Sequence, residues 1–160
     1  MTKGKLKKVI SITLGAILSM GLLTACGSNS TKNPTTEEVM NNIKDSVKLD
    51  SMKEGNEEKL TDLVGVDASD VEEFAYYMPT TNLQANQVAV IKVKDEDKVD
   101  DIKSQIENKI NESGEEFKTY LPEEYFLIEN KVIESEGKYI LVAVSKDSEE
   151  IEGAFEDSLK

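Results

Sequence analysis

The residue types that can carry chemistry are unevenly represented in this chain. It holds 32 aspartates and glutamates, five tyrosines and one cysteine, Cys26, but no histidine, and every basic residue is a lysine. Without histidine, the sequence offers no imidazole general base, no histidine-activated nucleophile and no imidazole metal site. Without arginine, it offers no bidentate clamp for phosphate or carboxylate groups. The remaining candidates are the carboxylates, the tyrosines and the thiol of Cys26.

Carboxylates are densest over residues 95–101, where five acids stand at the start of a predicted long helix. Clustered carboxylates can bind Ca²⁺, but the spacing of an EF-hand loop and its central glycine are missing. Favourable charge at a helix N-terminus explains the cluster, so we predict no metal site and no cofactor. Glu134 with Glu136, or Glu149 with Glu150, could serve carboxylate-based glycoside hydrolysis. Such pairs also arise by chance in so acidic a chain, and we assign no catalytic residue.

Four of the tyrosines form two pairs near prolines: Tyr76 with Tyr77 before Pro79, and Tyr120 with Tyr125 around Pro122. Aromatic side chains are favoured at binding hot spots, so we predict these four as the possible partner or ligand surface. The alternative is structural: one of Tyr76 and Tyr77 is buried at a strand end and the other is exposed, while the string with Tyr120 and Tyr125 closes a helix and packs the turn into the core. A pocket lined by Tyr76, Tyr77 and Tyr120 would favour a small ligand, and an exposed apolar patch would favour a protein partner.

The N-terminus has the pattern of a secretory signal peptide: a start with four lysines, an apolar stretch over residues 9–23, and small residues at its end. The sequence Leu23-Thr24-Ala25-Cys26 resembles the lipobox of bacterial lipoproteins, in which an aliphatic and two small residues precede cysteine. The resemblance implies that lipid is attached to Cys26, with acyl chains such as palmitate, and that cleavage falls between Ala25 and Cys26. Two acyl chains give the stable membrane anchoring that one chain lacks.

Three other interpretations of this segment remain open. An uncleaved membrane-spanning helix needs roughly 20 apolar residues, more than residues 9–23 provide. An ordinary secretory signal would leave Cys26 as a free thiol, and a buried core helix is disfavoured by the preceding lysines. We therefore predict a signal peptide over 1–25, a flexible lipid-anchored tether over 26–36 and a single domain over 37–160, at the extracytoplasmic face of the cell membrane.

The charge balance narrows the choice of partners. Residues 1–25 contain four lysines and no acid, so the rest of the chain has 15 lysines against 32 acidic residues, a net charge of −17. That charge disfavours nucleic acid and close contact with anionic lipid headgroups. It is typical of a solvated surface that keeps a domain soluble. The functional alternative is recruitment of cations or of a basic partner.

Hydrophobic spacing predicts the elements of the domain. We expect helices over residues 36–49, 56–65, 95–121 and 147–159, and strands over residues 71–78, 87–93, 125–128 with 131–135, and 138–144. Strands joined by tight turns indicate an antiparallel sheet of about four strands, with helices packed on one face, in an α+β domain. The segment 138–144 is apolar on both faces, which favours a central position.

Several strings in the second half of the chain support a family resemblance. They lie at residues 87–93, 117–124, 137–145 and 151–155. From about Val71 to Leu159 the chain resembles a family of small lipoproteins of clostridia and their relatives, defined by a domain of unknown function. The resemblance implies the cellular location and the fold, and supplies no activity.

These observations lead to an expected class of function. We expect a membrane-anchored extracytoplasmic lipoprotein that acts as a non-enzymatic binding or scaffold module of the cell envelope, whose partner is an envelope protein or a small ligand. The alternative is a small ligand-binding accessory lipoprotein. A hydrolase that uses carboxylates alone is a third and least favoured class.

Overall fold

A computed structural model of the chain describes residues 33–160, and two fully buried strands form its centre. Every residue of β3 (Gln87–Val93) and of β5 (Tyr139–Val144) is buried. They pair antiparallel, with Ile91 opposite Ile140. Next to β3 lies β2 (Val71–Pro79). The edge strands are β1 (Met52–Glu54), which pairs with β2, and β4 (Val132–Glu136), which pairs with β5, so the order is β1-β2-β3-β5-β4.

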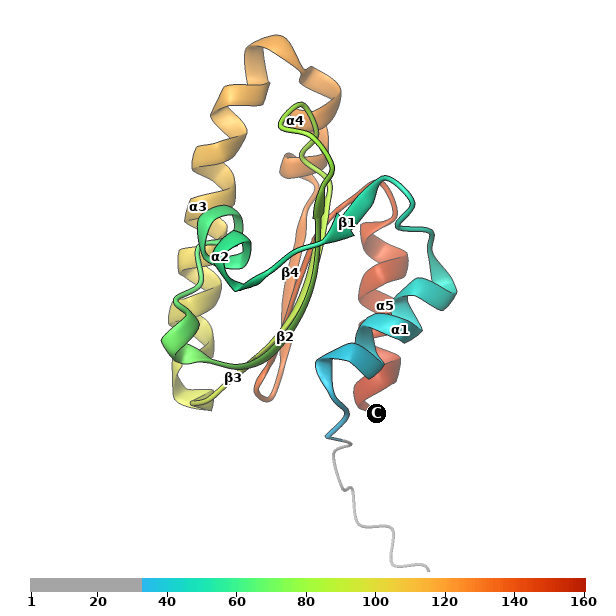
Figure 1. Cartoon of the computed structure of the whole chain (residues 1–160), viewed down its shortest axis with the longest axis vertical. Helices are drawn as coiled ribbons and strands as arrows, with labels where there is room; N and C mark the ends of the chain where they lie inside the picture. Colours follow the sequence, from blue (N-terminus) through green and yellow to red (C-terminus); the bar gives the residue numbers. More distant parts are fainter. Residues whose placement is uncertain (1–32) are drawn as a thin grey trace, which may run out of the picture. The chain divides into compact units, whose positions relative to one another are not determined.

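Side chains of the central strands alternate between two separate cores, as the strand period of two requires. On one face, Val90 and Leu141 pack against α1 (Thr36–Ser46) and α5 (Ser148–Leu159). On the other face, Ile91 and Val142 pack against α3 (Val99–Tyr120), which follows a 3₁₀ turn, η3 (Glu96–Lys98). The result is a three-layer domain with the sheet between two helical layers (Figure 1).

The expected α+β class and antiparallel sheet are confirmed, but two details of the prediction were wrong. The sheet has five strands, because the segment after residue 50 forms β1 against the end of β2. Helices cover both faces instead of one. The physical reason is that strands apolar on both sides must be covered on both sides, and two such central strands require two helical layers.

The segment predicted as a strand over residues 125–128 is helical, as part of α4 (Pro122–Glu129). The aromatic and aliphatic run there favours a strand on propensity alone. Pro122 at the first helical position, followed by Glu123 and Glu124 in the first turn, favours a helix start instead. The start signals prevail here over the strand propensity of the following residues.

The predicted helix over residues 56–65 is present but irregular. It consists of α2 (Glu57–Lys59) and a π-helical turn, η1 (Leu60–Val64), and a short 3₁₀ turn, η2 (Ala68–Asp70), follows. Gly65 ends it with φ of 87°, and a Cβ atom there would lie 2.7 Å from Cβ of Lys109. Glycine is therefore needed both for the left-handed backbone and for the close approach to α3.

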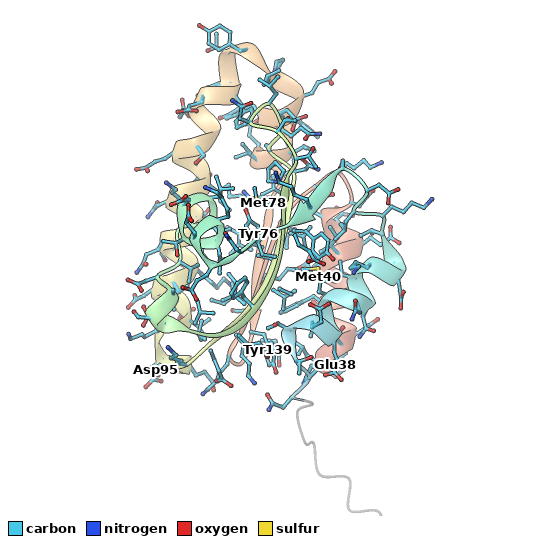
Figure 2. The ribbon with its side chains drawn as sticks, in the orientation of Figure 1. Glu38, Met40, Tyr76, Met78, Asp95 and Tyr139 are labelled. Carbon is cyan, nitrogen blue, oxygen red and sulfur yellow. The ribbon has the colours of Figure 1, made fainter. Side chains whose placement is uncertain are left out.

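Hydrogen bonds hold the first described residues to the domain. Thr35 caps α1: its Oγ1 accepts from the Glu38 N–H at 3.1 Å, and the Glu38 carboxylate accepts from the Thr35 N–H at 2.8 Å. The Tyr139 hydroxyl lies 2.6 Å from the carbonyl oxygen of Pro34. The first described residues are thereby held beside the turn between β4 and β5, the lower end of the domain in Figure 2.

Candidate functional site

A cleft of about 400 Å³ opens where β2 and β3 meet the second half of α3. Its apolar floor and polar rim come from segments that are far apart in the sequence. The floor contains Leu63, Met78, Ile110, Phe117 and Ile128, and the rim contains Lys53, Lys59, Thr80, Thr81, Asn82, Gln84 and Glu116. A concave site with an apolar floor and a few polar groups is typical of a binding site.

Close packing of α4 on α3 builds one wall of this cleft. Gly114 of α3 is buried, and a Cβ atom there would lie 2.9 Å from Cγ2 of Ile128 in α4. The Glu124 carboxylate accepts a hydrogen bond from the Ala85 N–H at 2.7 Å, which ties α4 to the loop between β2 and β3. The wall therefore depends on a small residue in α3 and on one acid of α4.

The cleft lining contains more lysines than carboxylates, whereas the whole chain contains more acids than lysines. Lys53 and Lys59 line it beside a single carboxylate among its lining residues, that of Glu116. Lys59 is paired with Asp62 at 3.1 Å, which raises the pKa of the lysine through their hydrogen bond. With one carboxylate and no histidine in its lining, the arrangement suits binding better than acid–base chemistry.

The segments at this end of the sheet also expose apolar side chains. We call the loop 80–86, α4 and the loop 145–147 the distal end, because they lie opposite the first described residues (Figure 1). Three large apolar side chains are strongly exposed: Leu83 at 62%, Tyr120 at 83% and Phe126 at 61%. Leu83 and Phe126 belong to the distal end, and Tyr120 is the last residue of α3, which leads into α4.

The four tyrosines predicted as one surface are not brought together. Tyr76 is 2% exposed and packs in the core beneath α3, whereas Tyr77 packs against the core beneath α1. Burial raises the pKa of Tyr76 well above its ordinary value. Neither tyrosine lines the cleft. Their positions follow from the strand period, since neighbours in β2 point to opposite faces.

The remaining two tyrosines lie near the distal end. Tyr120 is strongly exposed, and the ring of Tyr125 lies 5.5 Å from the ammonium group of Lys118. None of the four tyrosines lines the cleft. The polar run Thr80-Thr81-Asn82 after β2 forms part of its rim and is its signal in the sequence, whereas lining residues from other segments, such as Lys53 and Leu63, carried no such signal.

The acids over residues 95–101 lie at the end opposite the distal end, where Figure 2 labels Asp95. The Asp95 carboxylate accepts from the Asp97 N–H at 3.1 Å, as a cap of the turn before α3. Lys98 in the same turn pairs with Asp70 at 2.6 Å. Over residues 33–160, no group of three or more potential metal-ligating side chains comes together.

The two acid pairs considered for hydrolysis do not line the cleft. Glu134 and Glu136 are exposed on the edge strand β4, where Glu134 lies 3.5 Å from Lys103. Glu149 and Glu150 are exposed in the first turn of α5. Both pairs are explained by solvated edges and helix starts.

The predicted cleavage site at Ala25 and lipidation site at Cys26 lie outside the residues that the structure describes. Within residues 33–160, no helix is both long enough and apolar enough to cross a bilayer. The membrane location of the chain stays a prediction from the sequence of its first 26 residues.

Comparison with known protein families gives one match. Residues 45–145 match the family described as domain of unknown function (DUF4358). The chain belongs to this family. The DUF4358 region spans the sheet, α3 and α4, and therefore includes the cleft and most of the distal end, while most of α1 and all of α5 lie outside it. No curated protein and no solved structure matches the chain.

Proposed function

We propose that this DUF4358 protein is a lipid-anchored extracytoplasmic binding module of the cell envelope and not an enzyme. The proposal includes attachment to the membrane through Cys26 and kinship with the small lipoproteins of clostridia. Its support in the first residues is the basic start, the apolar stretch and the Leu23-Thr24-Ala25-Cys26 sequence. Its support against catalysis is the absence of histidine from the whole chain and the single carboxylate in the cleft lining.

The observation that carries the binding role is the position of the exposed apolar side chains. Leu83 and Phe126 belong to the distal end, and Tyr120 ends the helix that leads into α4. The proposed anchor at Cys26 precedes Pro34, which Tyr139 holds at the end of the domain away from the distal end. Single exposed apolar residues are ordinary, but three large ones on the segments at one end of a domain favour an interaction site.

Site-specific photocrosslinking in intact cells tests this role. The crosslinking residue replaces Leu83 at the distal end or, as a control, the exposed Asp101 at the opposite end. We expect one reproducible partner that crosslinks from position 83 and not from position 101, and that is lost in the Cys26→Ala variant. Equal crosslinking from both positions, or none above background, would count against a binding role for the distal end.

The alternative, a small ligand-binding accessory lipoprotein, is favoured by the cleft itself. Its volume of about 400 Å³ falls in the range of small-molecule sites. Ser113 lines the cleft and Phe126 does not, so Ser113→Trp blocks the cleft while Phe126→Ser alters the neighbouring surface. Partner capture that survives Ser113→Trp and is lost with Phe126→Ser indicates a protein partner. Partner capture that is lost with Ser113→Trp and survives Phe126→Ser indicates a ligand in the cleft.

A further inference from the structure

A second pocket lies at the distal end, between β1, α4 and the loop that joins β5 to α5. Its volume is about 300 Å³. It includes Ser51, Asn86, Glu123, Glu124, Ser145 and Asp147, and we call it the Asn86 pocket. It shares Gln84 of the loop 80–86 with the cleft, but its other polar residues do not line the cleft.

Asn86 has an unusual hydrogen-bond state. The residue is 9% exposed, and its amide nitrogen donates to Ser51 Oγ at 2.8 Å. Its Oδ1 is buried and accepts no hydrogen bond from any described residue. Buried polar atoms are nearly always paired, because an unpaired one loses its bonds to water without replacement. A ligand that brings an N–H donor into the pocket would supply the missing partner.

A second fixed polar group of the pocket is also an acceptor. Glu124 is held by its bond to the Ala85 N–H, and a carboxylate has further lone-pair positions for a second donor. Lys48 and Lys146 also line the pocket, but both are exposed side chains on long flexible stems. Asn86 and Glu124, which are held by hydrogen bonds, therefore present oxygen acceptors, whereas the ammonium groups of the two lysines can move away from the pocket.

The charge around the pocket favours a cationic donor. A neighbouring groove shares Ser145 and Asp147 with it and adds three acids of α5, Glu149, Glu150 and Glu152. Without its first 25 residues the chain carries 32 acids against 15 lysines. The pocket itself has three carboxylates, Glu123, Glu124 and Asp147, against two lysines, and this balance favours a cation over an anion.

We propose that the Asn86 pocket binds a protonated alkylamine, with Asn86 Oδ1 and the Glu124 carboxylate as its acceptors. The chemistry is shared by small free amines and by the lysine side chain of a partner protein. The proposal does not require any occupant in the apolar cleft, so it can fail or succeed separately from the proposed function.

The test is a titration of the full-length protein in a non-ionic detergent, in which binding is monitored through the NMR signal of the Asn86 side-chain amide. The probes are n-butylammonium, the peptide acetyl-Gly-Lys-Gly-amide, and acetate as the anionic control. We expect saturable shifts with both amines and none with acetate. Tighter binding of the peptide identifies a lysine of a partner protein as the natural occupant, and tighter binding of butylammonium identifies a free amine.

Variants assign the binding to the proposed acceptors. Asn86→Leu removes the acceptor and should weaken amine binding by about tenfold or more, because a bond to a charged donor is lost. Asn86→Asp adds charge and should strengthen binding. Glu124→Gln keeps an oxygen for the Ala85 N–H but loses the charge, and should weaken binding even if Asn86→Leu fails to fold. Glu112→Gln, on the exposed surface of α3, should change nothing.

Two outcomes would overturn the proposal. One is amine binding that is the same in the wild type, Asn86→Asp and Glu124→Gln proteins, since the amine would then bind elsewhere. The other is saturable acetate binding with no amine binding, since the buried amide would then present its nitrogen to the pocket.

Discussion

The contact between Gly55 and Tyr76 gives a sharp test of the structure. Gly55 follows β1, and a Cβ atom at this position would lie 2.3 Å from Cδ1 and 2.8 Å from Cε1 of the Tyr76 ring. Carbon atoms in contact normally lie about 3.5–4.0 Å apart, so the ring would have to move by about 1 Å or more. The ring cannot move freely, because it is buried and its hydroxyl donates to Gln87 Oε1 at 2.7 Å.

Gly55→Ala should therefore destabilise the domain by about 1–3 kcal/mol, the usual cost of overpacking a buried site. The loss of chain entropy in the unfolded state works in the opposite direction, by about 0.4–1 kcal/mol, and should not reverse the sign. Gly55 does not have a positive φ, so the effect reports packing and not backbone strain. In melting temperature the change corresponds to roughly 4 °C for each kcal/mol.

Gly153→Ala is the matched control, because no atom lies within 4 Å of a Cβ at this exposed position in α5. It should stabilise the domain by about 0.5–1 kcal/mol, through helix propensity alone. The assay is urea unfolding followed by circular dichroism, with the slope of the transition compared between variants. Gly55→Ala should cost less in a Tyr76→Leu background than in the wild type, because the clash with the ring is then absent. A Gly55→Ala protein as stable as wild type would refute the packing of Tyr76 against Gly55.

Two further predictions concern stability. Burial raises the pKa of Tyr76 above its ordinary value of 10.0, so the folded state keeps a proton that the unfolded state loses above that pH. Stability should fall as the pH rises above 10, by at most about 1.4 kcal/mol for each pH unit from this residue. Urea titrations at pH 9 to 11 should show a shallower fall for Tyr76→Phe, and an unchanged slope would contradict the assignment. Thr35→Ala removes the cap of α1 and should cost about 1 kcal/mol in the same assay at neutral pH. The exposed Thr119→Ala serves as control, and equal stability of the two variants would argue against the capping box.

Much of the fold could be predicted from local patterns. The apolar runs 87–93 and 138–144 predicted two strands, with 138–144 in a central position, and the spacing of Ile102, Ile106 and Ile110 marks the buried face of the long helix. These patterns succeed because the spacing of apolar residues within a strand or helix indicates directly which of its faces is buried. Short apolar runs are less decisive, and α4 was mistaken for a strand because residues 125–128 fit either period.

The candidate site was not predictable in the same way. The four tyrosines were chosen by residue type, but the fold places Tyr76 and Tyr77 on opposite faces of the sheet. The cleft gathers residues from β1, η1, the loop 80–86, α3 and α4, and its wall exists because Gly114 lets Ile128 approach α3. No local pattern encodes such a meeting of distant segments.

The sequence by itself determined the predicted membrane location, the strong negative charge and the classes of chemistry that the chain lacks, because these depend only on which residues are present and on short linear motifs. Only the tertiary structure decided which faces are covered and where a ligand can enter. It placed the exposed apolar residues at the distal end and left Asn86 Oδ1 without a partner among the described residues. The physical reason is that burial and hydrogen-bond pairing between residues far apart in the chain are fixed only when the sheet and both helical layers have assembled.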